Sequence, residues 1–499
     1  MSDENVFDLA VIGAGPGGYV AAIRAAQLDM KVVIIEQMES PGGTCLNVGC
    51  IPSKAMLDSS GRYHELEHIL PEHGIQAKAL TLDLEKMTAR KQAVVKKLTG
   101  GVDSLIKGNK ITKIEGRGVL GAPDENNVHT VQIFDHDNSQ WERSSGGLNQ
   151  YSTEKDSGEE KRKAREQIKA SRVLLAAGSV PVELPFMPFD GKQILSSTGA
   201  LSLTDVPKSM AIIGAGAIGL EMASVWASLG SKVTVIEMMD QILPGWDSQL
   251  ARTLMRDLKK LGVEFILKNS VTKAKHLKTG VKLTLENDPG ELKAEKVLVA
   301  VGRRPALDTA GIRDAGIELD SDSRRIAVDE NYQTSVSGVY AIGDLIHGPM
   351  LAHKAEEDGV TAVERMAGIP AHFDYGVIPG VVYTHPEGAT VGANEEELKK
   401  EGREYAKGVF PIPANGRALA MGSESGFVKI LADAKTDRVL GAQILSPWAS
   451  DLISEIVSIM EMKGSSEDIA RIVHAHPTLP EAVKEAALAV KKRSIHSLR

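Results

Sequence analysis

The first apolar run of the chain, residues 7–12, leads directly into a turn rich in glycine. We expect a helix over 19–28, and a second apolar run covers 31–36. A strand, a turn, a helix and a second strand in this order form a unit with parallel strands. Three glycines of the turn keep the spacing Gly-x-Gly-x-x-Gly: Gly13, Gly15 and Gly18.

Each of these glycines has a physical task in a dinucleotide-binding turn. The first allows a tight turn, the second lets the backbone approach a pyrophosphate, and the third lets the helix lie close to the sheet. The phosphates then face the open N–H groups at the helix N-terminus. Glu36 ends the second strand, where a carboxylate can accept hydrogen bonds from ribose hydroxyls. This combination is more specific than the glycine spacing alone, and it predicts a dinucleotide-binding fold.

The whole pattern recurs in the middle of the chain. Strands at 209–213 and 232–237 enclose a helix that ends near Leu229, and Glu237 takes the place of Glu36. Two such folds imply two different dinucleotides. A 2′-phosphate would need a basic residue here and would be repelled by Glu237, so we expect NAD rather than NADP; a merely solvated Glu237 is the alternative. The glycines of this second turn are Gly214, Gly216 and Gly219.

Composition is that of a large soluble enzyme. With 499 residues, of which 42% are hydrophobic, the chain has enough apolar material for several domains. A net charge of −8 argues against a nucleic-acid partner, which usually selects a basic surface. No apolar run is long enough to cross a membrane, and no leader segment is visible before the first strand. We therefore expect a cytoplasmic protein.

Cys45 and Cys50 are the only two cysteines of the chain. A disulfide between them would close a very small loop and add little entropic stabilisation, so its expected use is chemical. Pro52 and Ser53 suit the first turn of a helix, which would place Cys50 near a helix N-terminus, where the thiolate is favoured. We predict a redox-active pair. Two buried apolar cysteines are the structural alternative, and a zinc site would need further ligands that do not flank the segment.

The cysteine segment carries a resemblance. Residues 42–54 read Gly-Gly-Thr-Cys-Leu-Asn-Val-Gly-Cys-Ile-Pro-Ser-Lys, which resembles the redox-active disulfide of the flavin-dependent pyridine nucleotide–disulfide oxidoreductases, most of all their dihydrolipoamide dehydrogenase branch. Segments 176–179, 300–305 and 338–344 also fit that family. Alone, each is an ordinary buried strand that runs into a glycine turn, but their order and spacing support the resemblance. It covers the chain apart from 135–171.

The resemblance implies an enzyme that oxidises protein-bound dihydrolipoamide to lipoamide and reduces NAD+. Because the cysteines follow the first unit, FAD is expected there, one per subunit and not covalently bound, and NAD in the second unit. The family pattern places Asp344 on the ribityl chain of the flavin and Lys54 near the flavin, with Glu221 as the ion-pair partner of Lys54. It also implies two glycines beside the cofactors, Gly178 and Gly302.

The C-terminal part offers a base. Attack by a dithiol needs a group that forms the thiolate, and a histidine oriented by a carboxylate can serve. His476 and Glu481 resemble the family's base and its partner. A capping box between Thr478 and Glu481, ahead of a helix over 481–492, is the structural alternative, and we expect that one carboxylate cannot serve both geometries fully. His474 shows no such pairing, so we expect it to be structural, and we predict no metal site.

The expected fold is α/β: two Rossmann-like dinucleotide-binding domains, for FAD and NAD, and a C-terminal α+β dimerisation domain. We place the FAD domain at 1–180, the NAD domain at 181–305, a central domain that completes the FAD site at 306–375, and the interface domain at 376–499. The polar stretch at about 135–171 cannot bury a core, so we expect an exposed insertion, with a docking surface as the alternative.

The resemblance further implies a homodimer in which the C-terminal domain completes the partner's active site. His476 would deprotonate dihydrolipoamide, the thiolate would attack Cys45 of the other subunit, and Cys50 would remain as a thiolate beside the flavin. The lipoyl group would come from a protein of a 2-oxo acid dehydrogenase or glycine cleavage complex. Glutathione- or mercuric-type reductases share the disulfide and are alternatives within the family. They usually prefer NADP, against which Glu237 argues, and mercuric reductases tend to carry a further C-terminal cysteine pair, which is absent here. A non-catalytic flavoprotein scaffold is the remaining alternative, but all four predicted catalytic groups are present.

Overall fold

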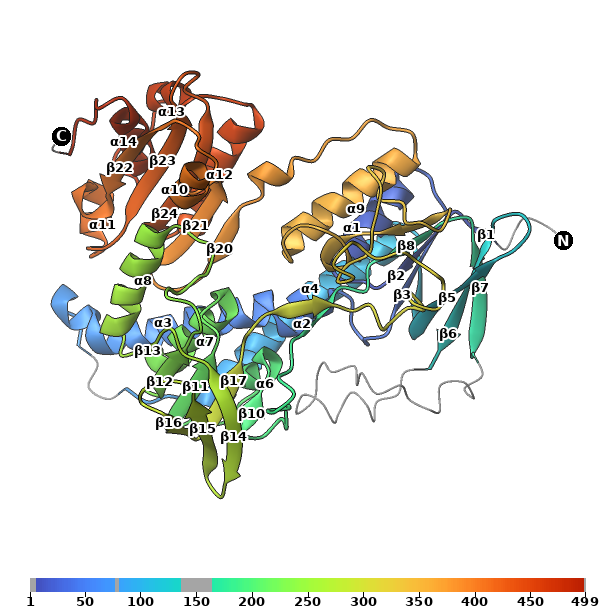
Figure 1. Cartoon of the computed structure of the whole chain (residues 1–499), viewed down its shortest axis with the longest axis horizontal. Coiled ribbons are helices and arrows are strands. Elements are labelled where there is room, and N and C mark those ends of the chain that lie inside the picture. Colours follow the sequence, from blue (N-terminus) through green and yellow to red (C-terminus); the bar gives the residue numbers. More distant parts are fainter. Residues whose placement is uncertain (1–5, 77–79, 136–163, 498–499) are drawn as a thin grey trace. The chain divides into compact units, whose positions relative to one another are not determined.

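The computed structural model describes residues 6–76, 80–135 and 164–497 and contains two compact units (Figure 1). Each unit is built from three separate stretches of chain. The first unit comprises Met1–Met56, Asp83–Thr204 and Gly302–Phe373, and the second comprises Leu57–Leu82, Asp205–Val301 and Asp374–Arg499. No helix among the described residues is long and apolar enough to span a bilayer.

A parallel sheet with the strand order β19-β8-β2-β3-β4 forms the centre of the first unit. All residues of β2 and β3 are buried, which explains their unbroken apolar runs, because helices usually cover both faces of a parallel sheet. Helices α1 and α9 lie side by side, as Figure 1 shows. The elements are β2 (Leu9–Ile12), α1 (Pro16–Gln27), β3 (Val32–Glu36), α2 (Gly43–Val48), α3 (Cys50–His68), α4 (Leu84–Gly108), β4 (Thr112–Glu115), β8 (Val173–Leu175), β19 (Val339–Ala341), η4 (Gly343–Leu345) and α9 (Ala352–Met366). Of α3, the residues up to Met56 belong to this unit and the rest to the second.

The first apolar run holds two strands rather than the single one expected. β1 (Val6–Phe7) and β2 are separated by a bend at Asp8, whose carboxylate accepts a hydrogen bond from the Lys31 N–H at 2.7 Å. The following helix begins at Pro16, earlier than expected, because proline has no N–H to lose in the first turn of a helix.

A second sheet in the first unit has the order β1-β7-β6-β5. Its strand β7 (Glu166–Ala170) lies inside the stretch 135–171 and buries Ile168 and Ala170, so the expectation that this stretch cannot bury a core is wrong for those residues. Residues 136–163, the bulk of that expected insertion, lie outside the described part of the chain. The remaining elements are β5 (Arg117–Pro123), β6 (His129–Phe134), β10 (Ile194–Leu195), α6 (Ser197–Leu201) and the antiparallel pair β9 (Ser179–Pro181) and β18 (Arg303–Pro305).

The second unit repeats the parallel arrangement with strands in the order β17-β11-β12-β13. The strand at 209–213 has the expected bounds, and the helix and second strand each end one residue before the expected position. An antiparallel sheet, β14-β15-β16, adjoins this part of the chain in sequence. The bounds are β11 (Ser209–Ile213), α7 (Ala217–Ser228), β12 (Lys232–Ile236), α8 (Ser248–Lys260), β13 (Glu264–Ile266), β14 (Val271–Leu277), β15 (Gly280–Leu285), β16 (Glu291–Ala294) and β17 (Lys296–Val299).

The C-terminal part of the second unit is α+β, as expected. Its antiparallel sheet has the order β20-β21-β24-β23-β22 and packs against α12 and α14 through one apolar core. Gly408 permits this packing, because a Cβ there would lie 2.0 Å from Ala486 O of α14. The elements of this part are η5 (Tyr375–Val377), β20 (Gly380–Val382), β21 (Glu387–Gly392), α10 (Glu395–Lys400), β22 (Tyr405–Pro411), η6 (Ile412–Ala414), α11 (Gly416–Ala420), β23 (Phe427–Asp433), β24 (Val439–Ser446), α12 (Ala449–Glu461), α13 (Ser466–Arg471) and α14 (Glu481–Val490). The stretch Leu57–Leu82 of the second unit contains η2 (Leu70–His73).

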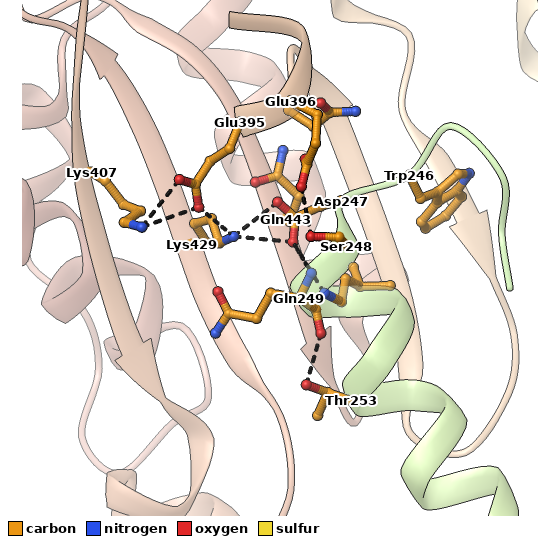
Figure 2. A network of polar contacts seen from close by, with 12 residues as sticks. Trp246, Asp247, Ser248, Gln249, Thr253, Glu395, Glu396, Lys407, Lys429 and Gln443 are labelled. Atoms are coloured by element: carbon orange, nitrogen blue, oxygen red, sulfur yellow. Dashed lines mark hydrogen bonds and ion pairs between the residues drawn. The ribbon is translucent and has the colours of Figure 1, made fainter. Parts of the chain in front are cut away.

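A buried lysine joins three elements of the second unit (Figure 2). The side chain of Lys429, on β23, is 1% exposed, and its Nζ lies 2.8 Å from Asp247 Oδ2 and 2.8 Å from Glu395 Oε1. Asp247 also caps α8 by accepting the N–H groups of Gln249 and Leu250. The network therefore ties the start of α8 to α10 and to the antiparallel sheet.

We expect Lys429→Met to lower the free energy of unfolding at pH 7 by about 3–5 kcal/mol, because it leaves buried carboxylates without their cation. Burial acts to raise the pKa of Glu395, but hydrogen bonds from Lys429, Lys407 and Tyr405 outweigh burial and lower that pKa to about 2. A carboxylate with a lowered pKa in the folded state stabilises above its ordinary pKa and loses this contribution as the pH falls towards the folded value.

The difference in stability between the wild type and Lys429→Met should therefore be largest near pH 7 and shrink as the pH falls towards the folded pKa of Glu395 in the wild type. Urea unfolding at a series of pH values between 7 and 3 measures this difference. A difference that stays constant down to pH 3 would contradict the assigned role of Glu395.

Candidate active site

The first glycine turn is closed by the carboxylate at the end of β3. Glu36 is buried; its Oε2 accepts the Ala14 N–H at 2.7 Å and its Oε1 accepts the Met38 N–H at 2.8 Å. Burial raises the pKa of Glu36, while these two N–H groups oppose that rise. Each carboxylate oxygen keeps further lone pairs after one such bond, so Glu36 can still accept hydrogen bonds from hydroxyl groups.

The second turn has the same construction. Glu237 is buried, and its carboxylate accepts the Ala215 N–H at 2.7 Å and the Met239 N–H at 2.9 Å. The first glycine of each turn has a left-handed backbone, with φ of 104° at Gly13 and 101° at Gly214, which favours glycine strongly. The sequence did not predict that each carboxylate accepts an N–H group of its own glycine turn. The equivalent positions of Glu36 and Glu237 in the two units could have indicated it.

Both helices that follow the turns begin without a side-chain cap. The N-caps of α1 and α7 are Gly15 and Gly216, and neither helix has a side-chain hydrogen bond at its start. In contrast, Asp247 caps α8 and Asn394 caps α10. Uncapped N–H groups need another partner, and a phosphate is a suitable one.

The two cysteines lie at adjoining helices of the first unit. Cys45 is in α2 and half-buried, whereas Cys50 is exposed and is the first residue of α3, as expected from Pro52. Gly49 links the helices tightly, because a Cβ there would lie 2.9 Å from Thr44 O. Cys50 therefore stands at the N-terminal end of α3, and the positive end of a helix favours a nearby thiolate.

The two thiols interact with each other. A hydrogen bond to Cys50 raises the pKa of Cys45 above its ordinary value, and burial and the nearby Glu356 act in the same direction. Lys54, one helical turn after Cys50, opposes the rise. In the reduced pair, Cys45 thus keeps its proton more firmly than an isolated thiol would.

Asp344 lies at the end of a short polar chain in the first unit. Its Oδ2 accepts the Ser179 hydroxyl at 2.5 Å, and the Arg303 Nε donates to Ser179 Oγ at 2.8 Å. Burial lowers the pKa of the Arg303 guanidinium, while Asp344 and Cys50 oppose that decrease. Two expected glycines flank this chain: Gly178 precedes Ser179, and Gly302 precedes Arg303. The segments that hold Ser179 and Arg303 were expected from the sequence, but a role for these two residues was not.

His476 is paired with the expected carboxylate. Its Nδ1 lies 2.9 Å from Glu481 Oε1, and the ring is 79% exposed. Glu481 Oε2 simultaneously accepts the Thr478 N–H at 2.8 Å, so the expectation that one carboxylate cannot serve both contacts is wrong. The capping box itself is incomplete, because the Thr478 hydroxyl donates to Ala475 O instead of capping α14. Burial acts to raise the pKa of Glu481, but the Thr478 N–H and His476 lower it below its ordinary value.

His474 also has a carboxylate partner, which the sequence did not reveal. Its Nε2 lies 2.8 Å from Glu455 Oε1 of α12, and its side chain is buried. The expectation that His474 lacks such a pair is therefore wrong, because the partner comes from a helix distant in sequence.

Asn415 supports the same loop: its Nδ2 donates to Thr478 O at 2.9 Å while its Oδ1 caps α11. An asparagine directly before a helix often caps it, so the sequence could have indicated a structural role for Asn415.

Glu221 is buried in α7, and its carboxylate accepts the Tyr383 N–H at 3.2 Å. Lys54 belongs to the first unit and Glu221 to the second, so their pairing stays a prediction. Within the described ranges, no group of three or more His, Cys, Asp or Glu side chains is placed to hold a metal ion.

Comparison with known families matches residues 7–359 to the pyridine nucleotide-disulphide oxidoreductases and residues 378–487 to the dimerisation domain of the same family. The chain belongs to this family. Membership implies FAD as a cofactor and a dimer formed through the C-terminal domain.

Named relatives of this oxidoreductase extend over nearly the whole chain. It is 47% identical to dihydrolipoyl dehydrogenase 2, mitochondrial, of Arabidopsis thaliana, with 99% of this chain and 92% of the relative covered. It is 47% identical to leghemoglobin reductase of Vigna unguiculata, covering 98% of this chain and 88% of the relative. Among bacterial relatives, dihydrolipoyl dehydrogenase of Cupriavidus necator is 42% identical, with 98% and 99% covered.

Solved structures agree with the family fold. The crystal structure of LpdA from Mycobacterium tuberculosis matches with a TM-score of 0.84 at 25% identity and covers 96% of this chain and 98% of that one. The flavoprotein disulfide reductase RclA from Escherichia coli has the same fold, with a TM-score of 0.79 at 24% identity and 96% and 99% covered.

Proposed function

We propose that this oxidoreductase is a dihydrolipoyl dehydrogenase, which oxidises protein-bound dihydrolipoamide to lipoamide and reduces NAD+. The observation that carries the proposal is the pair of adjoining thiols, Cys45 and Cys50, in a chain that also holds a carboxylate-paired histidine, His476. Relatives at 42–47% identity over nearly the full chain bear this name.

The residues of the first unit fit FAD, one per subunit and not covalently bound. Glu36 retains lone pairs for ribose hydroxyls, the uncapped start of α1 suits a pyrophosphate, and Asp344 suits the ribityl hydroxyls. NAD would occupy the corresponding turn of the second unit, where Glu237 would accept its ribose hydroxyls. When bound, FAD would supply the two-electron chemistry that links the reduced pair Cys45 and Cys50 to NAD+.

The protein residues perform the thiol chemistry. His476 takes the proton from one thiol of dihydrolipoamide, and Glu481 orients the ring and stabilises the imidazolium. The substrate thiolate attacks Cys45 Sγ, which breaks the disulfide and releases Cys50 as a thiolate. The second substrate thiol then attacks the substrate sulfur of the mixed disulfide and gives up its proton. Lipoamide forms, the bond to Cys45 breaks, and Cys45 leaves as a thiolate that can take that proton, so both cysteines are reduced.

The partners follow from the same proposal. The enzyme would act as a homodimer on a lipoyl-bearing protein of a 2-oxo acid dehydrogenase or glycine cleavage complex, with His476 serving the partner's cysteines. The domain limits 1–180, 181–305, 306–375 and 376–499 remain part of the proposal. Cytoplasm stays a prediction, since two of the relatives at 47% identity carry the word mitochondrial in their names and another is bacterial.

One relative at comparable identity is named leghemoglobin reductase, so reduction of a haem protein is a second candidate activity. A glutathione-type reductase would be expected to use NADP, against which Glu237 argues. A non-catalytic scaffold is disfavoured by the retained cysteines and by the His476–Glu481 contact. Parallel assays with dihydrolipoamide and NAD+, oxidised glutathione and NADPH, and a ferric haem protein and NADH separate these candidates.

The two cysteines should have separable roles. Cys45→Ser and Cys50→Ser should each abolish turnover of dihydrolipoamide with NAD+, because each removes one sulfur of the disulfide. In Cys45→Ser, the free Cys50 thiolate beside a bound flavin should give a long-wavelength absorbance without reduction, and Cys50→Ser should lack this band. Absorbance spectra of the two purified variants measure it. A band that persists in Cys50→Ser would reverse the assignment of the thiols.

Glu237 should set the nucleotide preference. We expect kcat/KM for NAD+ to exceed that for NADP+ by at least about 100-fold, since a buried carboxylate facing a 2′-phosphate costs several kcal/mol. Replacing Glu237 by serine, with an arginine at position 238, should narrow this ratio. Steady-state assays of the wild type and this double variant measure it. Comparable wild-type values for the two nucleotides would refute the role of Glu237.

Active sites shared between subunits predict complementation. In a mixed dimer of one Cys45→Ser subunit and one His476→Ala subunit, one site collects both lesions and the other is intact. The mixed dimer should recover about half of wild-type turnover, while each parent homodimer loses a factor of about 10² or more. Two affinity tags allow the mixed dimer to be purified. Activity no higher than that of the parents would mean that His476 acts within its own subunit or is not the base.

A further inference from the structure

A second buried ion pair lies in the first unit, beside Gly343, the residue that precedes Asp344. Lys354 and Asp358 stand one turn apart on α9, both side chains are 0% exposed, and Lys354 Nζ lies 2.7 Å from Asp358 Oδ2. Burying two charges costs more than most such pairs return, so a fully buried pair is weak evidence of a stabilising role. The contacts of this pair point to another role.

Both members of the ion pair make a hydrogen bond with the backbone of Gly343. Lys354 Nζ donates to Gly343 O at 2.9 Å, and the Gly343 N–H donates to Asp358 Oδ2 at 3.0 Å. Gly343 has a left-handed backbone, with φ of 67°, and directly precedes Asp344 in η4. The orientation of the peptide that carries Asp344 is thus set from both sides by the ion pair.

Helix α9 also packs closely against the first glycine turn. A Cβ at Gly359, next to Asp358, would lie 2.7 Å from Gly17 O, and a Cβ at Gly17 would lie 2.8 Å from Ala355 O. Helices α1 and α9 therefore approach at a distance that only glycine permits. One short segment of α9 contacts both the start of α1 and the peptide before Asp344.

We propose that Lys354 and Asp358 are positioning residues for the flavin: through Gly343, they hold Asp344 in register with the start of α1, so that one FAD molecule meets both at once. The inference rests on the proposed function, because it takes the first unit to be the FAD site. Neither side chain touches the flavin in this proposal. They act by fixing the peptide before Asp344, which reduces the ordering that FAD would otherwise have to impose on binding.

The test measures FAD affinity of the full-length chain after the flavin has been removed. We expect Lys354→Met to weaken FAD binding by about 10- to 100-fold, the range known for the loss of residues that orient metal ligands from behind. Lys429→Met is the matched control: it also leaves buried carboxylates without their lysine, but in the other unit, and should leave FAD affinity within about twofold of the wild type. Flavin fluorescence titration gives affinity, and thermal unfolding of the flavin-free protein gives stability.

Two double variants keep the test decisive if Lys354→Met does not fold. Lys354→Met/Asp358→Asn and Lys354→Met/Asp358→Leu both lack the two buried charges, but only asparagine can still accept the Gly343 N–H. At similar melting temperatures, the asparagine variant should bind FAD about fivefold more tightly than the leucine variant.

The possible outcomes separate two failures. If the flavin-free wild type does not bind FAD, the proposed cofactor is wrong. The positioning role is refuted if the wild type binds FAD and Lys354→Met or the leucine double variant binds it equally well. It is also refuted if the two double variants have the same affinity for FAD. In either case, the ion pair contributes only to the packing of the core. A loss of affinity in Lys429→Met equal to that in Lys354→Met would also refute it, because the effect would then follow general destabilisation.

Discussion

A buried carboxylate that accepts the N–H of the glycine turn is the interaction on which both nucleotide units depend. The turn must leave its helix N-terminus open, so it cannot be closed by a cap on the helix itself. Glu36 and Glu237 solve this from the neighbouring strand: each accepts one N–H within the turn and one just beyond its own strand. The helix start stays available for a phosphate, and the turn is still held.

Other parts of the site follow the same principle of support from a neighbouring element. The His476 loop is held by Glu481 from the following helix and by Asn415 from another. Asp344 is held by Ser179 on its side chain and through Gly343 on its backbone. In each case, the group proposed to contact substrate or cofactor keeps atoms available, because another residue fixes its position.

The sequence predicted the elements whose causes are local. Two glycine turns, their strands and helices, and the start of α3 near Cys50 all follow from glycine geometry, apolar runs and Pro52, and the structure has them within a few residues. Contacts between distant segments could not be predicted in this way. Glu455 as the partner of His474, and α9 behind Gly343, depend on how helices pack, and no spacing in a single sequence states that. The double use of Glu481 was missed because its two oxygens were treated as one acceptor.

The likeness of the two turns has a consequence for inhibitors. Both present a left-handed glycine, an uncapped helix and a carboxylate that keeps free lone pairs, and both would face the part that FAD and NAD have in common, adenosine diphosphate. The turns themselves therefore give little basis for telling the two nucleotides apart, and selectivity must come from what surrounds the other half of each molecule. A compound that mimics only adenosine diphosphate would compete at both places, whereas a selective one must reach the nicotinamide or the flavin end.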